Sequence, residues 1–571
     1  MIRAKVIASL FLLGFTANVV NADWYNNAVV YQIYPRSFKD SDGDGIGDLN
    51  GITSQLNHIV DIKGNAIWLS PIYTSPQVDF GYDISNFTDV DRDYGTLADF
   101  DRLVAKAKSL GLKVLLDFVP NHSSHEHPWF KKSILRIKPY DEYYVWRDAK
   151  IVNGTRQPPN NWICNFEGSA WEWNDIRKQY YLHQFATGQP DLNYRSPALN
   201  QEMKNVLTFW MNRGVDGFRI DAINHMFEDA RFLDEPSSNR PELPKEDYES
   251  LLHIYTKDQN ETYQVLSSWR KLLDDHSKTS KYNETKIILT EAYTSFEKTM
   301  RFYDAGSTVP FNFMFMIDLN NKSNAYDFER VINRWMNNVP NGKVANWVVG
   351  NHDNPRVASR FGTKRADQIS MLSLMLPGVA VVYNGDEIGM ENRRFTYDET
   401  VDPAGRNAGP NRFYLKSRDP ERTPYQWDNT TSAGFSNRTV TWLPVNENYK
   451  YLNLAAQKPD LLSHYRMFKV MTALKSVMFQ SSVKVTAVND KILSVVRRQG
   501  QTIIAFLMNV SDIPVTLNAS RLLNLPEQMK IYAASVGSNL RPGSWSLLSD
   551  LVIPGSASVV YTTPNLSFVE I

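Results

Sequence analysis

The sequence has almost no cysteine, because Cys164 is the only one among 571 residues. A single cysteine excludes any internal disulfide, so a stable fold has to rely on a large hydrophobic core, on bound metal or on glycans. Cys164 lies away from every motif described below, which indicates a role in packing rather than in thiol chemistry.

The chain also has no excess of charge and no long basic stretch. It carries 62 Lys and Arg against 62 Asp and Glu, so its formal net charge is zero. A surface that binds nucleic acid or an anionic membrane needs clustered positive charge. We therefore expect no nucleic-acid partner, and a small neutral ligand fits this balance.

A segment long enough to cross a membrane is missing as well. The apolar stretch Val6–Phe15 is too short to span a bilayer, and Arg3 and Lys5 precede it. Val20 and Ala22 suit positions −3 and −1 of a cleavage site. The pattern predicts a signal peptide over residues 1–22, and an uncleaved anchor is the alternative.

Two further features indicate a secreted, extracellular protein. The C-terminal sequence TTPNLSFVEI lacks the hydrophobic tail of a glycolipid-anchor signal. The chain has eleven Asn-x-Ser/Thr sequons, which predict N-glycans on the surface. They include Asn86, Asn153, Asn283, Asn437 and Asn509.

Short apolar strands alternate with amphipathic helices after the signal. The alternation predicts a (β/α)8 TIM barrel over residues 23–120 and 191–483. An irregular domain, residues 121–190, interrupts it after the third strand, and alternating strands over 484–571 predict a C-terminal antiparallel β-sandwich. The eight expected barrel strands are Val29–Tyr34, Ala66–Leu69, Lys113–Phe118, Gly217–Asp221, Ile287–Glu291, Phe311–Ile317, Asn346–Gly350 and Val379–Tyr383.

Helix-end signals support this division. Thr96 and Asp99 form a Thr-x-x-Asp capping box before an apolar helical pattern, and Ser196-Pro197 opens another helix. Asp327–Asn338 and Pro459–Val477 are further strong helical patterns.

Three acids follow three of the expected barrel strands. They are Asp221 in GFRIDA, Glu291 in IILTEAY and Asp353 in VVGNHD. The C-terminal ends of barrel strands face one shared pocket, where active sites are built. Converging carboxylates can supply a nucleophile, a proton donor and a third charge that orients the substrate, which is the chemistry of glycoside cleavage.

The residues around two of these acids indicate different roles. Arg219 and Asp221 lie two apart, so on a strand they face the same way, and the cation is expected to lower the pKa of Asp221. Glu291 ends an apolar strand, which is expected to raise its pKa and suits a general acid. A buried structural ion pair remains the alternative for Arg219 and Asp221.

Three more motifs place polar side chains at strand ends. DFVPNHSS contributes His122, with Asp117 available to brace the loop. NHDNPR contributes His352, and GYDIS contributes Tyr82 and Asp83.

These five motifs, in this order, closely resemble the α-amylase family of glycoside hydrolases (family 13), over nearly the whole mature chain. The resemblance implies that Asp221 is the nucleophile and Glu291 the acid and base. Asp353 would bind ring hydroxyls and stabilise the transition state. The subsite for the terminal glucose would be lined by Asp83, His122, Arg219 and His352, with Tyr82 stacked against the sugar.

Two motifs are similar to the oligo-1,6-glucosidase and α-glucosidase branch of that family. They are QPDLN (189–193) and SRDPERTPYQWD (417–428), and the opening DWYNNAVVYQIYPRSF resembles secreted insect-type maltases. The resemblance implies that Arg422 pairs with Asp83 and closes the pocket behind the terminal sugar, which enforces exo action.

An acidic loop, DSDGDGIGD (40–48), predicts a structural Ca²⁺ site. Clustered oxygen ligands suit this hard cation, although an Asp/Gly-rich turn without metal remains the alternative. The twelfth position from its first residue is Gly51 rather than the Glu that an EF-hand requires, and the family uses such a loop for calcium. The expected ligands are Asp40, Asp42, Asp44, the Ile46 carbonyl and Asp48.

The sequence thus predicts a secreted, retaining, exo-acting α-glucosidase that releases terminal α-linked glucose from maltose, sucrose and short maltodextrins. Ala222, directly after the expected nucleophile, is small and favours maltose-like and sucrose-like substrates. Two alternatives stay open. One is a transglucosylase or sucrose isomerase of the same branch, and the other is a non-enzymatic binding or receptor protein.

Overall fold

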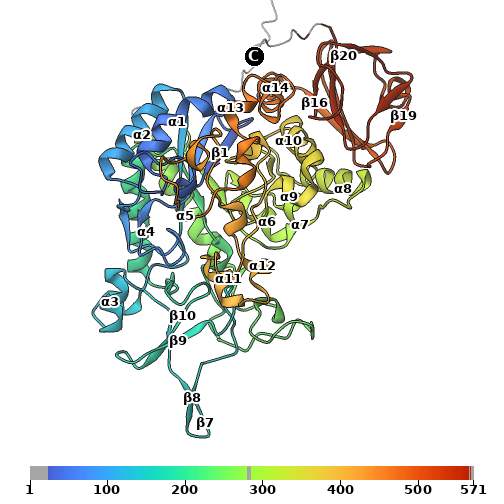
Figure 1. Cartoon of the computed structure of the whole chain (residues 1–571). Coiled ribbons are helices and arrows are strands. Elements are labelled where there is room, and N and C mark those ends of the chain that lie inside the picture. The colour runs from blue at the N-terminus through green and yellow to red at the C-terminus, as the bar shows by residue number, and fades with distance from the viewer. Residues whose placement is uncertain (1–22, 280–283, 565, 567–571) are drawn as a thin grey trace, which may run out of the picture.

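A ring of eight parallel strands that alternate with helices forms the centre of the molecule (Figure 1). The computed structural model describes residues 23–279, 284–564 and 566. The strands pair in the order β13-β12-β11-β5-β2-β1-β15-β14, so the predicted (β/α)8 barrel is confirmed. Their bounds are β1 Val29–Ile33, β2 Ala66–Leu69, β5 Lys113–Phe118, β11 Gly217–Ile220, β12 Ile287–Thr290, β13 Val309–Pro310, β14 Asn346–Val348 and β15 Val379–Tyr383.

Side chains rather than a strand ladder close the ring between β13 and β14. The backbone N–H of Asn312 donates to Asn346 Oδ1 (2.8 Å), and Asn346 Nδ2 donates to the Pro310 carbonyl (2.6 Å). Pro310 has no N–H of its own to offer a neighbouring strand. Asn346 therefore replaces the missing ladder bonds at this seam.

The barrel strands alternate between two hydrophobic surfaces. Val30, Trp68, Leu115, Leu289 and Val381 belong to the cluster that fills the inside of the ring. Their neighbours along each strand belong to the larger cluster under the surrounding helices. This period of two also turns Arg219 inward, with its guanidinium 5.1 Å from the centre of the Trp68 ring.

Amphipathic helices cover the ring on its outer side. The predicted capping box is present: Thr96 Oγ1 accepts from the Asp99 N–H, and Asp99 accepts from the Thr96 N–H in return. Ser196 likewise caps α4. The larger helices are α1 Leu49–Asp61, α2 Leu97–Ser109, α4 Pro197–Asn212, α5 Glu261–Thr279, α6 Phe296–Asp304, α8 Ala325–Met336, α10 Ala366–Met375 and α14 His464–Val477.

One expected strand is wrong. The apolar run Phe311–Ile317 was expected to form the sixth strand, but the strand is β13 (Val309–Pro310) and Met314–Ile317 is the short helix α7. A short apolar run fits a buried strand and a buried helix equally well, so its pattern cannot separate the two. The helix predicted over Pro459–Val477 likewise begins later, at His464.

A small, irregular unit follows β5 and projects from one end of the barrel (Figure 1). It holds the three-stranded sheet β6-β10-β9 and its own aromatic-rich core, which includes Trp162, Cys164 and Trp171. We call this unit, residues 121–190, domain B. Its strands are β6 Trp146–Arg147, β9 Trp171–Asn174 and β10 Gln179–Leu182, with an exposed hairpin of β7 Lys150–Val152 and β8 Thr155–Gln157.

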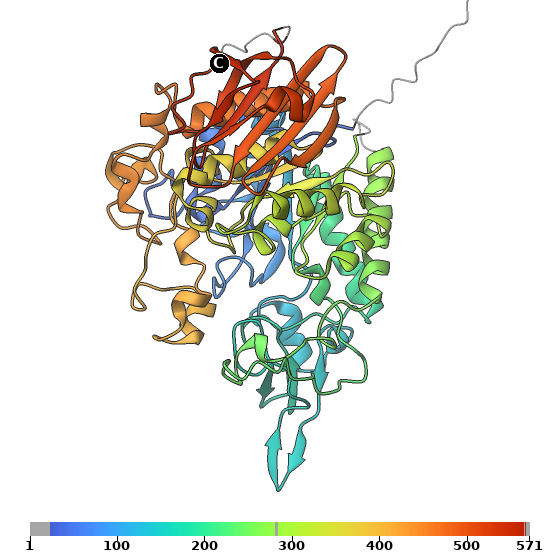
Figure 2. The same cartoon turned by 90° about the vertical axis from the view of Figure 1, so that its right-hand side faces the viewer.

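The C-terminal part is antiparallel, as predicted, and lies at the opposite end of the barrel from domain B (Figure 2). One face of its six-stranded sheet packs on a two-stranded sheet through Leu507, Leu517 and Ile553, and the other face shares the barrel's core. The six strands are β16 Ser482–Ala487, β17 Ile492–Gln499, β18 Thr502–Asn509, β23 Ser558–Thr562, β20 Gln528–Ala534 and β21 Trp545–Leu547, and the pair is β19 Val515–Leu517 with β22 Leu551–Ile553.

Several sequence expectations concern the surface and the termini. The signal peptide (1–22), the sequon at Asn283 and the C-terminal end lie outside the described residues. Within the described ranges, no helix combines the length and hydrophobicity that a bilayer crossing needs. Asn509 is buried, and its Nδ2 donates to the carbonyls of Ile513 (2.8 Å) and Ile553 (3.1 Å), so this sequon is not at the surface.

Candidate active site

The three predicted catalytic acids line one cavity at the C-terminal ends of the barrel strands. Asp221 follows β11, Glu291 follows β12, and Asp353 lies in the loop after β14. The cavity has a volume of about 440 Å³, and Tyr82 and His122 also line it. This is toward the small end of the roughly 300–1,000 Å³ typical of ligand pockets, which suits a short ligand.

A fully buried guanidinium holds two of the acids in place. Arg219 Nη1 donates to both Asp117 oxygens (2.8 and 3.0 Å) and to Asp221, while its Nη2 lies 2.6 Å from Glu291 Oε2. Gly217, at the start of the same strand, permits this register, because a Cβ there would meet the Ile287 carbonyl at 2.4 Å. Arg219 is thus fully buried and positions both acids, and its predicted contact with the sugar stays a prediction.

Burial dominates the ionisation of both acids. It raises the pKa of Asp221 to about 7, even though Arg219 acts in the opposite direction. It raises the pKa of Glu291 to about 8, again against Arg219, and the charge of Asp221 adds to the increase. The expected rise for Glu291 agrees with the structure, whereas the expected fall for Asp221 does not, because desolvation outweighs one shared cation.

These shifts predict a bell-shaped pH dependence. Cleavage by paired carboxylates needs one ionised and one protonated group, so protonation of Asp221 should give the acidic limb and ionisation of Glu291 the alkaline limb. We expect both apparent pKa values in a profile of kcat/KM for maltose to lie above the ordinary carboxyl values of about 3.9 and 4.3. An alkaline limb near 4.3 would contradict the assignment.

The residue after Asp221 adds a further bond to Glu291. Ala222 adopts a left-handed conformation (φ 41°), which is costly for a residue other than glycine. In return its backbone N–H donates to Glu291 Oε2 at 3.0 Å. The strained turn therefore helps to hold the carboxyl of Glu291 between Ala222 and Arg219.

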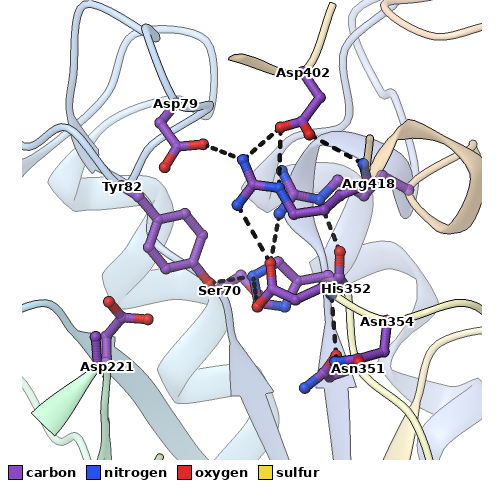
Figure 3. Close-up of polar contacts among 12 residues, drawn as sticks. Ser70, Asp79, Tyr82, Asp221, Asn351, His352, Asn354, Asp402 and Arg418 are labelled. Carbon is purple, nitrogen blue, oxygen red and sulfur yellow. Dashed lines mark hydrogen bonds and ion pairs between the residues drawn. The ribbon is translucent and has the colours of Figure 1, made fainter. Parts of the chain in front are cut away.

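A hydrogen-bonded chain fixes Tyr82 and His352 beside the cavity (Figure 3). Gln32 Nε2 donates to His352 Nδ1 (2.9 Å), which leaves the proton of the neutral ring on Nε2. His352 Nε2 then donates to the Tyr82 hydroxyl (2.6 Å), and that hydroxyl donates to Asp117 Oδ2 (3.2 Å). Burial holds the pKa of His352 well below its usual range, so the chain stays neutral at His352.

Asp353 carries the negative charge of the site. Burial alone would raise its pKa, but the neighbouring His352 ring and the charges of Arg422 and Arg418 hold it well below its usual range. Arg422 Nη2 lies 2.7 Å from Asp353 Oδ1, and Arg418 Nη1 lies 3.4 Å from the same atom. Asp353 is thus ionised, whereas burial raises the pKa of the other two acids.

The predicted pair of Arg422 and Asp83 is wrong. Arg422 is fully buried and binds Asp353 and the His352 carbonyl (2.8 Å) instead. Asp83 is also fully buried and accepts from Ser75 Oγ and from the backbone N–H of Val78, each at 2.8 Å. Asp83 therefore braces its own loop, and neither residue lines the cavity.

The ion pair at the cavity wall involves Asp79 and Arg418, which sequence reasoning missed. Arg418 Nη2 lies 2.7 Å from Asp79 Oδ1, and Arg418 also donates from Nε to Asp402 Oδ1 at 3.0 Å (Figure 3). Each residue stands four positions before the one chosen from the sequence, in the same motif. The signal was present, because each motif offers two residues of the required charge, but sequence alone does not rank them.

His122 lies where the sequence placed it, in the cavity lining. Its Nε2 is 3.1 Å from the Tyr82 carbonyl and 3.1 Å from Gln189 Nε2, and Gln189 Nε2 also donates to Asp79 Oδ2 (3.1 Å). Burial lowers the pKa of His122 to about 3, so its imidazole is neutral. His122 and Asp79 therefore form one wall through Gln189, the first residue of the QPDLN motif.

The family follows from sequence comparison. A family model described as the alpha-amylase catalytic domain matches residues 32–480. The chain belongs to the α-amylase family. It is 45% identical over 549 residues to an α-glucosidase of Apis mellifera, covering 94% of this chain and 95% of that relative. It is 46% identical over 537 residues to a salivary α-glucosidase of Anopheles gambiae, covering 92% of this chain and 90% of the relative.

Among solved structures, the α-glucosyl transfer enzyme XgtA matches with a TM-score of 0.82 and 32% identity, covering 95% of this chain and 100% of that one. Together with the curated relatives, this makes the chain an α-glucosidase, a glycoside hydrolase of the α-amylase family. The transglucosylase alternative is not better supported than hydrolysis.

The acidic loop of this α-amylase family member gathers three of its expected metal ligands. Carboxylate oxygens of Asp40, Asp42 and Asp48 lie within 4.8 Å of one another. Asp44 is exposed and accepts from the Ile46 N–H (2.7 Å). Clustered carboxylate oxygens suit a divalent cation.

Proposed function

We propose that the enzyme is a retaining, exo-acting α-glucosidase in which Asp221 is the nucleophile, Glu291 the acid and base, and Asp353 the group that orients the sugar. The observation that carries the proposal is the shared contact of Arg219 with Asp221 and Glu291 in one cavity. That contact holds two carboxyl groups of different pKa at the same cavity.

In the first step, an oxygen of ionised Asp221 attacks the anomeric carbon of the terminal glucose. The new C–O ester bond forms as the glycosidic C–O bond breaks, and the proton of Glu291 goes to the leaving oxygen. Asp353, ionised beside two guanidinium groups, binds ring hydroxyls and stabilises positive charge that develops on the sugar.

In the second step, water releases the glucose. Ionised Glu291 takes a proton from water, the water oxygen attacks the anomeric carbon, and Asp221 leaves as a carboxylate. Two displacements at one carbon retain the α configuration of the product. The pair returns to its starting protonation state.

The wall made by Asp79 and Arg418 supports exo action. Their ion pair lines the cavity together with Tyr82, and we propose that it blocks a saccharide chain from passing beyond the sugar bound there. We propose that only a terminal, non-reducing glucose fits, and that maltose, sucrose and short maltodextrins are the substrates.

Product analysis tests this function. We expect maltopentaose to yield glucose and maltotetraose first, and proton NMR to show α-glucose before mutarotation. Initial release of β-glucose would contradict a retaining mechanism, and initial release of maltose or maltotriose would contradict exo action.

Transfer of glucose to a second sugar is the alternative that one comparison favours, because XgtA is an α-glucosyl transfer enzyme. Transfer and hydrolysis share the glucosyl-enzyme and differ in whether a sugar or water attacks it. Products formed at high sucrose separate the two. Oligosaccharides or a sucrose isomer as the main products would favour transfer.

We further propose that the acidic loop binds Ca²⁺. Asp40, Asp42 and Asp48 would hold it, with Asp44 and the Ile46 carbonyl as additional oxygen ligands. The Asp48 side chain also caps α1, since it accepts from the Gly51 N–H at 2.8 Å. Bound metal would therefore stabilise the start of the first barrel helix.

Removal of calcium should lower the melting temperature. A ligand present at about 100 times its Kd stabilises a protein by about 2.7 kcal/mol, which is the loss that EDTA should cause. Calorimetry with EDTA, and then with added CaCl2, measures it. The matched variant Asp42→Asn alters an exposed ligand, so its melting temperature should no longer change when EDTA is added. If EDTA lowers the melting temperature of this variant as much as that of the wild type, the metal binds elsewhere.

Secretion and N-glycosylation complete the proposal. A salivary relative and the signal-like N-terminus support secretion. Asn86, Asn153 and Asn437 are exposed and can accept glycans.

A further inference from the structure

Three chain segments meet at the mouth of the catalytic cavity. Domain B contributes Phe166, the loop after β11 contributes Tyr248 and Glu249, and α12 (Phe413–Lys416) contributes Leu415 and Lys416. In both views α11 (Pro403–Ala408) and α12 extend from the barrel toward domain B (Figures 1 and 2). The mouth is thus built from loops rather than from the barrel itself.

A four-residue ion-pair cluster joins these three segments. It consists of Glu167, Asp247, Arg412 and Lys416, and we call it the rim clasp. Arg412 Nη2 lies 3.0 Å from Glu167 Oε1 and also binds Asp247. Lys416 Nζ lies 3.2 Å from Asp247 Oδ2 and 3.8 Å from Glu167 Oε1.

The rim clasp differs from a solvated surface ion pair. The side chains of Asp247 and Glu167 are only 1% and 8% exposed, and those of Arg412 and Lys416 are each 23% exposed. Two positive and two negative charges balance within it. Partial burial weakens screening by salt, so the clasp can hold the segments together where an exposed pair contributes little.

Three of the four members belong to the cavity wall or adjoin a residue that does. Asp247 Oδ1 accepts from the Glu249 N–H (2.9 Å) and so caps the short helix η4 (Tyr248–Ser250). Glu167 follows Phe166, whose carbonyl accepts from Asn407 Nδ2 at 2.9 Å. Lys416 lines the cavity itself. Loss of the clasp would therefore free three parts of the mouth at once.

We propose that the rim clasp sets the chain-length preference of the enzyme by holding the mouth to the size of a short leaving group. The proposal rests on exo action: the terminal glucose occupies the floor near Asp221, so the rest of the substrate must lie in the mouth. Glu167, Asp247 and Arg412 are positioning residues, because they act through Tyr248, Glu249 and Phe166, whereas Lys416 lines the mouth directly. The wild-type enzyme accordingly favours disaccharides over longer maltodextrins.

Two variants test the clasp. Asp247→Asn removes its charge but keeps an oxygen that can cap η4, and Arg412→Met removes the contacts to both acids. The readout is the ratio of kcat/KM for maltopentaose to kcat/KM for maltose. We expect this ratio to rise by roughly two- to fivefold, the range for an ion pair of modest strength.

Controls separate this role from a structural one. The substrate 4-nitrophenyl α-glucoside has a small leaving group, so its kcat/KM should stay unchanged. Arg334→Met breaks a pair with Glu297 (3.0 Å) between α8 and α6, away from the cavity, and should leave the ratio unchanged. The double variant should shift the ratio no more than either single variant, because the two residues act as one unit.

An unchanged ratio in variants that still cleave the nitrophenyl substrate would overturn the proposal. If neither variant folds, Lys416→Met is the test, because it leaves the contacts of Arg412 with both acids in place. An unchanged ratio of kcat/KM for maltopentaose to kcat/KM for maltose in that variant would also overturn the proposal. Failure of the exo assignment looks different, because wild-type enzyme would then release maltose or maltotriose from maltopentaose.

Discussion

Asp221→Asn is expected to abolish turnover, with kcat/KM for maltose falling by roughly 10⁴- to 10⁶-fold, as for the loss of a catalytic nucleophile. An amide oxygen is too weak a nucleophile to form the glucosyl ester. The amide can still accept the bond from Arg219 Nη1, so the geometry of the site should survive. The loss would then report chemistry rather than folding.

Asp216→Asn is the matched control for this variant. Asp216 is buried at the other end of the same strand, where its Oδ2 accepts from the Val114 N–H at 2.9 Å. We expect that variant to keep its activity. Glucose release from maltose and the melting temperature of both variants make the measurement. Robust activity of Asp221→Asn would place the nucleophile elsewhere.

Glu291→Gln is expected to lower activity according to the leaving group. For maltose, whose alkoxide leaves only with a proton, kcat/KM should fall by roughly 10²- to 10⁴-fold, the usual contribution of general acid catalysis. A dinitrophenyl α-glucoside releases a stable phenolate and needs no proton for the first step. Its glucosylation rate should fall much less.

A second measurement on Glu291→Gln isolates the base step. Azide attacks the glucosyl-enzyme without a base, so it should restore turnover of the dinitrophenyl substrate and give α-glucosyl azide. Glu249→Gln serves as the control. Glu249 also lines the cavity, but within the described residues it makes no contact with Asp221 or with Ala222, the residue that binds Glu291. Equal losses for both substrates would exclude Glu291 as the acid.

Much of the site could be predicted because strand periodicity fixes it. Arg219 and Asp221 share a face since they lie two apart on β11, and Glu291 must meet them because β11 and β12 are neighbours. The position of each acid at a strand end then defines the pocket. This reasoning needs only local sequence and the geometry of the barrel.

Loops were predicted less well, because their contacts do not follow from a period. Asp79 and Arg418 meet across more than three hundred residues, and the sequence offered Asp83 and Arg422 with the same charges. The effect of burial on pKa values was the second feature that the sequence could not predict. The rise in the pKa of Asp221 depends on desolvation by neighbours that no motif reveals.

The fold shows the same division. The antiparallel C-terminal strands and seven of the barrel strands were found at or near their places. The sixth was missed because β13 is only Val309–Pro310, and its seam with β14 depends on the side chain of Asn346. A two-residue strand leaves no periodic signal in the sequence.

The lone thiol offers a practical advantage. Cys164 is buried in domain B, where its Sγ donates to the Glu167 carbonyl at 3.0 Å, and burial raises its pKa to about 12. Such a thiol is protonated at neutral pH and shielded from alkylating reagents. A cysteine introduced at Ile151, on the exposed β7–β8 hairpin, would therefore take a maleimide dye alone. The enzyme is a ready background for fluorescence experiments on domain B, with no native cysteine to remove first.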